Sequence, residues 1–407
     1  MNVPKLRFKN AEGADFPLWT ISKLGNEVQF SKGGKLGKSD LQKEGSHQCL
    51  LYGELYTSYG SIASKIFSRT DTDSDTTSQK YDVVMPTSGE TAEDIATATC
   101  IPFDGILYGG DLIILRSQTL YGPFLSYQIN SSLKRKISRV AQGKSVVHIG
   151  AEKIKPISFS FPCLEEQQKI ASFFSTLDQK IEINERKLEA LEKLKKGLMQ
   201  KVFSQEIRFR TNEGCYFPEW ETKHLSEIVE SISYGLNAAA VKFDGKNRYL
   251  RITDINERTN KYNSTNPVSP SCTADKKYLL KEGDIVFART GNSVGKTYIY
   301  EKSDGDLYYA GFLIRARVNN NICPYFIFIQ TLTNKYKKWV DIMSKRSGQP
   351  GINSEEYGNL EVVLPCREEQ ELIASLFTKF DSKIDKVITK INHLKKLKQG
   401  FMQQMFV

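Results

Sequence analysis

The chain contains no run of 18 consecutive apolar residues, and its N-terminus lacks the apolar segment of a secretion signal. On these grounds we expect a soluble protein of the cytoplasm. The seven cysteines form no Cys-x-x-Cys pair, and the four histidines show no metal-binding spacing. We therefore predict no metal site and reduced thiols that fill apolar gaps. This includes Cys163 and Cys366, which hold equivalent places in the chain.

Sequence motifs of catalysis are also missing. There is no Gly-x-Ser-x-Gly, no Asn/Asp-Pro-Pro-aromatic tetrapeptide of amino-methyltransferases, and no histidine with an acidic partner at a readable spacing. Residues 290–297 come near a phosphate-binding P-loop, but only three residues separate Gly291 from Gly295 where the motif needs four. A β-rich stretch follows, where a P-loop needs the N-terminus of a helix. We predict a non-catalytic chain, with a P-loop NTPase at Gly291–Thr297 as the enzymatic alternative.

The composition favours a folded and basic protein. With 407 residues, 40% of them hydrophobic, the chain is long enough for several domains. Its net charge of +10 suits binding to nucleic acid, although a merely solvated basic surface would carry the same charge. The charge therefore indicates a class of partner and says nothing about the fold.

The most informative feature is an internal repeat. The segment FPCLEEQ at 161–167 returns as LPCREEQ at 364–370, and the match continues without a gap to the C-terminus. Upstream, the stretch from Arg7 to Trp19 returns in outline from Arg208 to Trp220. A tandem duplication of this kind builds two similar halves, which can hold two sites at a fixed distance.

Each half ends in a segment with the apolar period of a long helix. Apolar residues recur at alternating steps of three and four, the pattern of a coiled-coil seam. The seam positions are Ile170, Leu177, Ile181, Asn184, Leu188, Leu191, Ile373, Phe380, Ile384, Val387, Ile391 and Leu394. Asn184 stands where the second copy has Val387, and a polar seam residue of this kind can fix register and pairing.

The two long helices are predicted to run antiparallel. A helix of 40 residues is about 60 Å long, whereas a compact domain of 150 residues is roughly 40 Å across and has neighbouring termini. The second globular part connects the end of the first helix to the start of the second, so it cannot bridge parallel helices. The same reasoning places the last residues, Phe406 and Val407, beside the first residues of the chain.

We therefore expect an α+β fold with a duplicated, pseudo-two-fold layout. The predicted parts are a globular domain at 1–160, a long helix at 161–205, a second globular domain at 206–363 and a second long helix at 364–407. Each domain should hold one amphipathic helix that opens at a proline, at 123–140 and at 324–346. Strand-like runs lie at 81–85, 111–115, 157–161, 249–253, 284–288, 297–300, 312–318 and 360–364.

Basic, glycine-rich loops occur in both globular parts beside these basic helices. Such loops can enter a DNA groove and present hydrogen-bonding side chains to phosphates and base edges. The candidate DNA-binding residues are Lys32, Lys35, Lys38, Lys134, Arg135, Gln142, Lys144, Arg289, Asn292, Ser293, Lys296, Lys345, Arg346, Ser347 and Gln349. We expect Lys345 and Arg346 to serve affinity in general, and Arg289 and Gln349 to serve sequence preference.

Three features together resemble the specificity (S) subunit of type I restriction–modification systems. These are the Phe-Pro-x-Trp opening, the Pro-Cys-x-Glu-Glu-Gln-x-x-Ile-Ala-Ser start of each long helix, and the duplicated layout. The resemblance covers essentially the whole chain, and Gly283–Gly291 is similar to a recurrent segment of that family. It implies two target-recognition domains that each read one half of an asymmetric, split double-stranded DNA target. Residues 87–90 of the first half offer no clear counterpart to the Arg289–Lys296 loop.

The resemblance also implies partners that carry the chemistry. The two long helices would form the spacer and the platform for two methyltransferase (M) subunits, which bind S-adenosylmethionine and methylate adenine. Motor-nuclease (R) subunits, where present, would use ATP and Mg²⁺. No cofactor is expected in this chain. The alternative is a coiled-coil adaptor that joins two protein partners without binding DNA.

Overall fold

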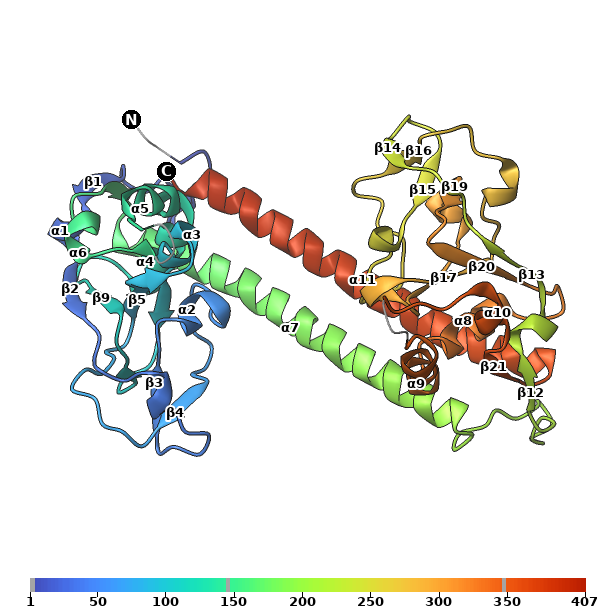
Figure 1. Cartoon of the computed structure of the whole chain (residues 1–407). Helices are drawn as coiled ribbons and strands as arrows, with labels where there is room; N and C mark the ends of the chain where they lie inside the picture. Colours follow the sequence, from blue (N-terminus) through green and yellow to red (C-terminus); the bar gives the residue numbers. More distant parts are fainter. Residues whose placement is uncertain (1–3, 144–146, 346–348) are drawn as a thin grey trace. The chain divides into compact units, whose positions relative to one another are not determined.

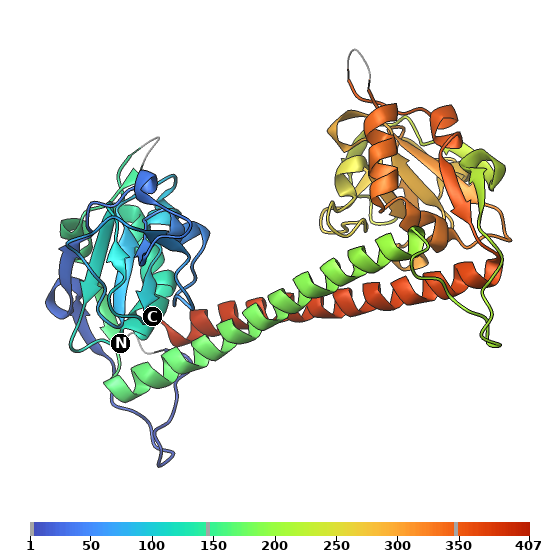
Figure 2. The same cartoon turned by 90° about the horizontal axis from the view of Figure 1, so that it is seen from below.

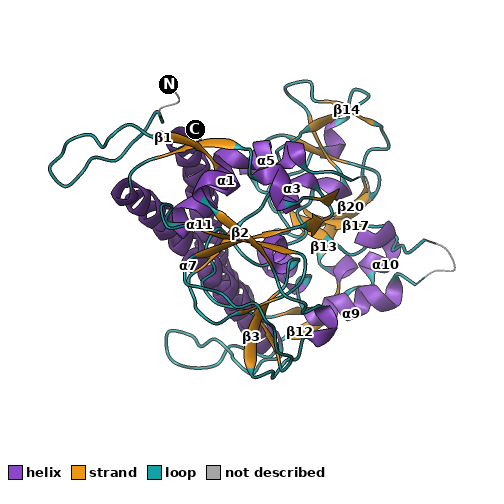
Figure 3. Ribbon diagram, turned by 90° about the vertical axis from the view of Figure 1, so that its left-hand side faces the viewer, coloured by secondary structure: helices purple, strands orange, loops and turns teal. Residues whose placement is uncertain are grey.

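The computed structural model describes residues 4–143, 147–345 and 349–407. The chain divides into two compact units. Unit 1 contains the residues up to Arg186 together with Ile388–Val407, and unit 2 contains Lys187–Val387. Both units mix helices and strands, which confirms the predicted α+β fold (Figure 3).

A four-stranded antiparallel sheet of order β2-β9-β5-β7 forms the centre of unit 1. Its strands are β2 (Gln29–Lys32), β5 (Asp82–Pro86), β7 (Thr99–Ile101) and β9 (Leu112–Arg116). Smaller sheets join β3 (His47–Leu50) with β4 (Ser68–Thr70) and β8 (Leu107–Tyr108), β1 (Thr20–Lys23) with β11 (Ser158–Phe161), and β6 (Ser88–Gly89) with β10 (Val147–His148). Every residue of β5 is buried, so the sheet is covered on both faces.

Unit 2 repeats this plan with the order β13-β20-β17-β18. These strands are β13 (Val229–Tyr234), β17 (Ile285–Ala288), β18 (Thr297–Ile299) and β20 (Leu313–Val318). The smaller pairs are β12 (Glu221–His224) with β21 (Glu361–Leu364), β14 (Ala240–Lys242) with β16 (Val268–Pro270), and β15 (Arg248–Leu250) with β19 (Leu307–Tyr309). The predicted strand at 249–253 is shorter than expected, because a 3-10 turn at Ile252–Asp254 ends it.

The helices of the globular parts agree with the prediction in unit 1 but not in unit 2. Helix α4 (Gly122–Gln128), a π turn (Ile129–Leu133) and α5 (Lys134–Val140) form one helical stretch, as expected for 123–140. The single helix predicted for 324–346 is wrong. It divides into α8 (Pro324–Gln330) and α9 (Asn334–Met343), because Thr333 begins a new helix by accepting a hydrogen bond from the Tyr336 N–H.

Shorter helical segments complete the globular parts. They are α1 (Leu24–Glu27), α2 (Glu54–Thr57), α3 (Ala92–Ile95), α6 (Ala151–Ile154) and α10 (Ser354–Gly358), with further 3-10 turns at Lys38–Asp40, Leu225–Glu227, Lys276–Tyr278, Gly291–Ser293 and Lys302–Asp304.

Two long helices are the clearest elements in Figure 1, α7 (Leu164–Phe203) and α11 (Arg367–Met405). Within unit 1, the Asp178 carboxylate pairs with Lys398 at 2.6 Å and the Glu185 carboxylate pairs with Lys395 at 2.6 Å. The residue number rises from 178 to 185 along α7 while that of its partner on α11 falls from 398 to 395. The helices therefore run antiparallel there, as predicted. Figure 2 shows the end of α7 beside the first half of α11 in unit 2, where Lys195 pairs with Asp381.

The predicted seam is largely buried. Nine of its twelve positions are buried, and Leu191, Phe380 and Leu394 are half-buried. The amide nitrogen of Asn184 donates to the Lys180 carbonyl oxygen of its own helix at 2.6 Å. Its polar group is therefore satisfied within α7.

The repeated Glu-Glu-Gln motif locks the start of each long helix to its globular part. The fully buried Glu166 carboxylate accepts two hydrogen bonds from the Arg7 guanidinium, at 3.0 and 2.7 Å. In unit 2 the buried Glu369 carboxylate accepts from the Trp220 indole at 2.9 Å and lies 3.7 Å from Arg208. The pairing of this glutamate with the upstream arginine occurs in both units, whereas the tryptophan bond occurs in unit 2 alone, because the Trp19 indole nitrogen has no hydrogen-bond partner among the described residues.

The glutamine of the motif has an equally specific role. The Gln167 side chain accepts a hydrogen bond from the Tyr121 N–H at 2.8 Å and donates to the Pro162 carbonyl at 2.9 Å. Gln370 makes the equivalent bonds to the Cys323 N–H and the Pro365 carbonyl. The motif that identifies the repeat is thus a structural joint.

The expectation for the thiols is only partly correct. Cys49 and Cys100 are buried, but Cys163 and Cys366 are exposed, and so are Cys215 and Cys272. Cys163 and Cys366 immediately precede α7 and α11, where the chain turns outward before the buried glutamate. Position in the repeat therefore did not indicate burial.

Candidate nucleic-acid interface

The two candidate loops of unit 2 lie against one another at one end of the four-stranded sheet. The Gly291 N–H donates to the Pro350 carbonyl at 3.0 Å, and the Ile352 N–H donates to the Arg289 carbonyl at 2.9 Å. Gly291 has a φ of +73°, which favours glycine, and a Cβ added there would lie 3.2 Å from the Gln349 amide nitrogen. The structure therefore places the exposed Gln349 beside Gly291, two residues after Arg289.

Arg289 lies over an aromatic ring at this end of the sheet. Its guanidinium carbon is 4.8 Å from the centre of the Tyr234 ring, and one guanidinium nitrogen lies 3.4 Å from the Gly311 carbonyl. Partial burial acts to raise the pKa of Tyr234, but hydrogen bonds from Ser354 and the Arg289 charge outweigh it and lower that pKa. Among the described residues no carboxylate pairs with Arg289, which is half-buried at this end of the sheet.

The other candidates of unit 2 have different surroundings. Asn292 is exposed and Ser293 half-buried in the 3-10 turn that follows Arg289, and Lys345 is exposed just after α9. Arg346 and Ser347 lie outside the described residues. A strand, β18, follows the glycine loop, so the local structure agrees with the expectation that this segment is not a P-loop.

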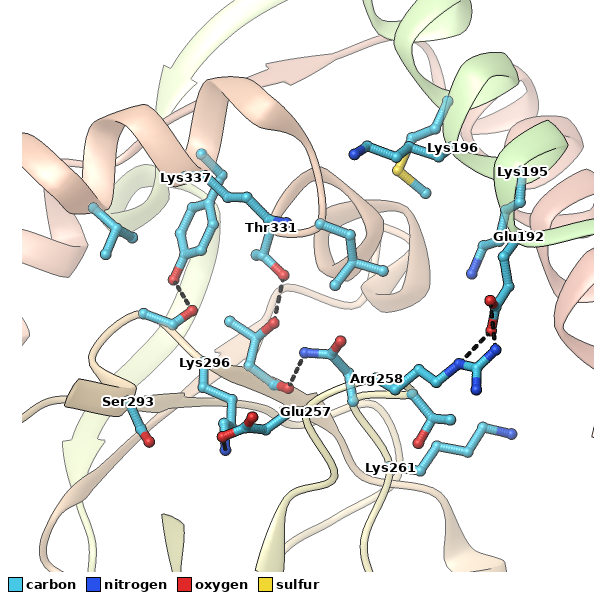
Figure 4. Close-up of a pocket in the computed structure, with 18 of the residues that line it drawn as sticks. Glu192, Lys195, Lys196, Glu257, Arg258, Lys261, Ser293, Lys296, Thr331 and Lys337 are labelled. Atoms are coloured by element: carbon cyan, nitrogen blue, oxygen red, sulfur yellow. Dashed lines mark hydrogen bonds and ion pairs between the residues drawn. The ribbon is translucent and has the colours of Figure 1, made fainter. Parts of the chain in front are cut away.

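Lys296 lines a cavity of about 750 Å³ between the loops and the long helices (Figure 4), and Arg289 is not among the residues of its lining. Its amine donates to the Ile255 carbonyl at 3.3 Å and to the Glu257 carboxylate at 3.2 Å. Lys195, Lys196 and Lys337 also line this cavity. The lining also includes the carboxylates Glu192, Glu257, Asp341, Asp381 and Asp385, so the cavity carries charges of both signs and the Lys296 charge is partly neutralised inside the unit.

One wall of this cavity attaches the globular part to both long helices. The Arg258 guanidinium donates twice to the Glu192 carboxylate of α7, at 2.8 Å each, and Lys261 pairs with Asp385 of α11. We call the segment Asn256–Lys261 the brace. Unit 1 has a similar cavity of about 650 Å³ beside Asp178 and Lys398, and its lining includes no segment like the brace.

The candidates of unit 1 occupy several places. Lys32 ends β2 at the same end of the sheet as Arg289 in unit 2, and Lys35 and Lys38 are exposed in the loop that follows. The exposed Gln142 is hydrogen-bonded through its backbone to His148, at 3.0 and 2.8 Å. Lys134 and Arg135 lie on α5. Lys144 lies outside the described residues.

Sequence reasoning missed three residues at these surfaces, Tyr234, Phe312 and Arg258. Tyr234 could have been found by alignment of the repeats, because its Tyr-Gly pair matches Lys32-Gly33. Phe312 had no signal of its own, since an aromatic residue before a strand usually packs in the core. Arg258 lies in a segment that the sequence gave no reason to place near a helix.

Two absences hold for the part of the chain that the structure describes. No group of three His, Cys, Asp or Glu residues is placed to hold a metal ion. No helix there is both long and apolar enough to cross a membrane.

Comparison with protein families decides the identity. The family model described as the type I restriction modification DNA specificity domain matches twice, at residues 18–193 and 218–396. The chain belongs to this specificity family. The two matches coincide with the two repeats, and the resemblance seen in the sequence is confirmed. Specificity chains are the non-catalytic members of these systems, in agreement with the prediction.

Individual specificity subunits show how far the similarity extends. The type I restriction enzyme MjaVIII specificity subunit of Methanocaldococcus jannaschii is 26% identical over 418 positions, covering 97% of this chain and 94% of that protein. The MjaX specificity subunit of the same organism is 31% identical over 210 positions, covering 50% of this chain and 49% of that protein. The chain thus spans about half the length of the MjaX relative and nearly all of MjaVIII.

Solved structures agree on the fold of specificity subunits. The crystal structure of a type I restriction–modification S subunit from M. genitalium has a TM-score of 0.68 at 16% identity, over 100% of this chain and 99% of that one. A chain from a study of assembly and conformational transition of the type I system has a TM-score of 0.54 at 15% identity, over 96% and 98% of the two chains.

Proposed function

We propose that the chain is the DNA-recognition subunit of a type I restriction–modification complex, and that each unit reads one half of a bipartite, asymmetric target. The observation that carries this proposal is the duplication itself. Units 1 and 2 share one sheet plan and one helix joint, yet the ends of their sheets present different side chains. A common scaffold with different exposed ends suits two different half-sites held in one molecule.

The helices supply the platform for partners in this proposal. Leu194 on α7 and Leu397 on α11 hold equivalent positions in the repeat, and both side chains are exposed, at 57% and 37%. Exposed leucines on two equivalent helix faces suit two copies of one partner, and we assign those places to two methyltransferase subunits. S-adenosylmethionine would bind to those subunits, and ATP with Mg²⁺ would bind to motor-nuclease subunits where these are present.

The net charge of +10 supports DNA as the ligand. Phosphates that the protein neutralises release their counterions, so the affinity for DNA should fall steeply as the salt concentration rises. A plot of log K against log salt concentration should have a slope of about −0.9 for each phosphate contacted. A protein adaptor that does not bind DNA would lack this dependence. Salt titration of DNA binding by the complex, compared with the methyltransferase subunits alone, therefore separates a DNA-reading subunit from an adaptor.

The decisive test is methylome sequencing of a host that expresses this chain together with a cognate methyltransferase subunit. We expect one split, asymmetric motif with a fixed gap, methylated only when this chain is present. Normal methyltransferase levels without such a motif would overturn the DNA-reader proposal. In that case the antiparallel helices would belong to an adaptor between proteins.

A further inference from the structure

The ends of the two sheets are built on the same backbone frame. In unit 2 the Arg289 N–H donates to the Phe312 carbonyl at 3.1 Å, and in unit 1 the Thr87 N–H donates to the Asp111 carbonyl at 2.8 Å. The Arg289 carbonyl accepts from Ile352 at 2.9 Å, and the Thr87 carbonyl accepts from Ile149 at 3.0 Å. Arg289 therefore corresponds to Thr87, and Phe312 corresponds to Asp111.

A third pair of positions follows from the neighbouring strand. The Gly235 N–H donates to the Leu313 carbonyl at 3.1 Å, and the Gly33 N–H donates to the Leu112 carbonyl at 2.9 Å. A Cβ at Gly235 would lie 2.1 Å from a backbone oxygen and one at Gly33 would lie 2.2 Å from another, so both positions require glycine. The residues just before these glycines, Tyr234 and Lys32, therefore also correspond.

The side chains at these three positions differ completely. Unit 2 has Tyr234, Arg289 and Phe312, which we call the reading triad. Unit 1 has Lys32, Thr87 and Asp111 in their places, and the Thr87 hydroxyl lies 3.4 Å from the Asp111 carboxylate. The backbone hydrogen bonds are the same in both units, whereas the side chains at these positions differ in charge, size and polarity.

The reading triad is organised for contact with a ligand. The Tyr234 oxygen accepts hydrogen bonds from both the N–H and the hydroxyl of Ser354, at 3.1 Å each, so the ring beneath the guanidinium is fixed. That ring restrains Arg289 without consuming its donors. By contrast, Arg317 in the same sheet donates two hydrogen bonds to the buried Asp284 carboxylate, at 2.8 and 2.7 Å. Arg289 is thus oriented but left free to bind.

Phe312 supplies apolar surface beside this cation. Its side chain is 63% exposed in the turn before β20, although most phenylalanines of the chain lie in the cores. A single exposed apolar residue needs no explanation by itself. Here, however, its backbone is hydrogen-bonded to that of Arg289 at 3.1 Å, so the exposed Phe312 ring and Arg289 belong to neighbouring positions at the same end of the sheet.

We infer that the reading triad forms the base-recognition site of unit 2, with Arg289 bound to a guanine and Phe312 in contact with a neighbouring thymine. This inference rests on the proposed DNA-reading function. Arginine can donate two hydrogen bonds to O6 and N7 of guanine in the major groove, and apolar side chains contact the thymine methyl group. Tyr234 is a positioning residue for Arg289. Lys32, Thr87 and Asp111 read different bases at the matching place, so the half-sites differ.

The test compares methylomes of hosts that express the methyltransferase with the full chain or its variants. Arg289→Lys keeps the charge but loses the paired donors, so we expect relaxed preference at the guanine by about 10-fold or more. Phe312→Ala should relax the adjacent thymine. The half-site read by unit 1 should not change in either variant. Tyr234→Phe, which keeps the ring, should preserve the motif better than Tyr234→Ala.

Lys345→Ala is the matched control, because this exposed lysine should lower methylation evenly across sites and leave the motif unchanged. If the unaltered chain yields no split motif, the proposed function fails. If it yields one and the Arg289 and Phe312 variants leave both half-sites unchanged, this inference alone is overturned. Loss of methylation with no change of motif, in a variant whose thermal midpoint matches that of the unaltered chain, overturns it as well.

Discussion

At the scale of single residues, the most consequential contact is the buried ion pair that ties α7 to the start of the chain. The Glu166 side chain is fully buried and the Arg7 side chain is only 16% exposed. Hydrogen bonding to Glu166 raises the pKa of Arg7 above its ordinary value, although burial opposes this. A buried carboxylate of this kind depends on its partner, because an uncompensated charge in the interior is costly.

Arg7→Ala should therefore destabilise the chain strongly, by about 3–5 kcal/mol, because it leaves the Glu166 charge buried without a partner. The double variant with Arg7→Met and Glu166→Gln removes both charges and should recover much of that loss. Thermal unfolding monitored by circular dichroism measures both effects. The control is Arg186→Ala, whose exposed pair with Glu182 should contribute less than about 1 kcal/mol. Equal shifts for Arg7→Ala and Arg186→Ala would contradict the role of the buried pair.

At the scale of elements, the long helices carry one glycine each at equivalent positions, Gly197 in α7 and Gly400 in α11. A Cβ at either position would meet nothing within 4 Å. Glycine in a helix interior costs backbone entropy without any gain in packing here. These positions are weak points that no intramolecular contact requires.

Gly197→Ala and Gly400→Ala should each stabilise the chain by about 0.5–1 kcal/mol, since alanine restricts the unfolded chain and favours the helix. Thermal and urea unfolding measure the change. The contrasting substitution is Gly235→Ala, whose Cβ would lie 2.1 Å from the Ala310 carbonyl oxygen and should destabilise the sheet end. Destabilisation by Gly197→Ala or Gly400→Ala would contradict this prediction, because it would mean that the added methyl group meets another part of the protein.

The brace is an element of unit 2 whose ion pairs are too exposed to contribute much stability. The Arg258 and Glu192 side chains are 60% and 32% exposed, and pairs of this kind are worth about 0–1 kcal/mol. Their effect should be local, because they fasten a short loop to two helices.

Arg258→Ala combined with Lys261→Ala should leave the thermal midpoint nearly unchanged but speed hydrogen exchange at 256–261. The loop would keep two side-chain anchors, the hydrogen bond from Asn260 to the Thr297 carbonyl at 2.8 Å and the pair of Glu257 with Lys296 at 3.2 Å. Hydrogen exchange with mass spectrometry resolves this segment, and Lys223→Ala, which removes an exposed pair elsewhere in the unit, is the control. Unchanged exchange at 256–261 would mean that the brace does not hold the loop.

The elements that the sequence predicted well are those with long periodic patterns. The helices α7 and α11 are visible because their apolar period extends over many turns. Short strands such as β3 and β4 were missed, since three or four residues carry little pattern and their partners are distant. The break between α8 and α9 was missed because the amphipathic pattern continues across it. The Thr333 side chain caps the start of α9 and so favours the break, although the pattern favours one continuous helix.

The sequence predicted which loops belong to the candidate interface, but not which side chains surround them. Glycine and basic residues marked the loops at Arg289 and Gln349, and the structure brings these two together. The sequence could not show that Tyr234 would lie beneath Arg289, because this depends on the register of β13 with β20. It also gave no sign that Lys296 would turn into the cavity. Loop residues are identifiable by type, whereas their neighbours are set by long-range pairing.

At the scale of the whole molecule, the repeat continues across the chain ends. In unit 2 the Ile207 N–H donates to the Lys201 carbonyl at 3.2 Å, within the continuous chain that leaves α7. In unit 1 the Leu6 N–H donates to the Gln404 carbonyl at 3.1 Å, which is the same bond made between the two ends of the chain. The segments near residues 6 and 404 of unit 1 are therefore held together by a hydrogen bond where unit 2 has a continuous backbone.

A circular permutant should exploit this proximity. Phe203 is followed by three residues before Ile207, and joining Val407 to Lys5 through one residue would place the same number between Phe406 and Leu6. That joining residue should be glycine and not Pro4, because the corresponding Gln205 has a φ of +59° that proline cannot adopt. New ends between Ser204 and Glu206 would then open the equivalent link in unit 2.

We expect this permutant to fold and, with the methyltransferase subunit, to methylate the same motif as the unaltered chain. The physical reason is that every core and both sheet ends keep their contacts, while one exposed linker is exchanged for another. Methylome sequencing gives the motif, and the thermal midpoint reports folding. The control opens the chain within β17 instead, which should abolish folding because all four of its residues are buried. A folded permutant with a different motif would mean that chain continuity, and not the two sheet ends, determines which bases are read.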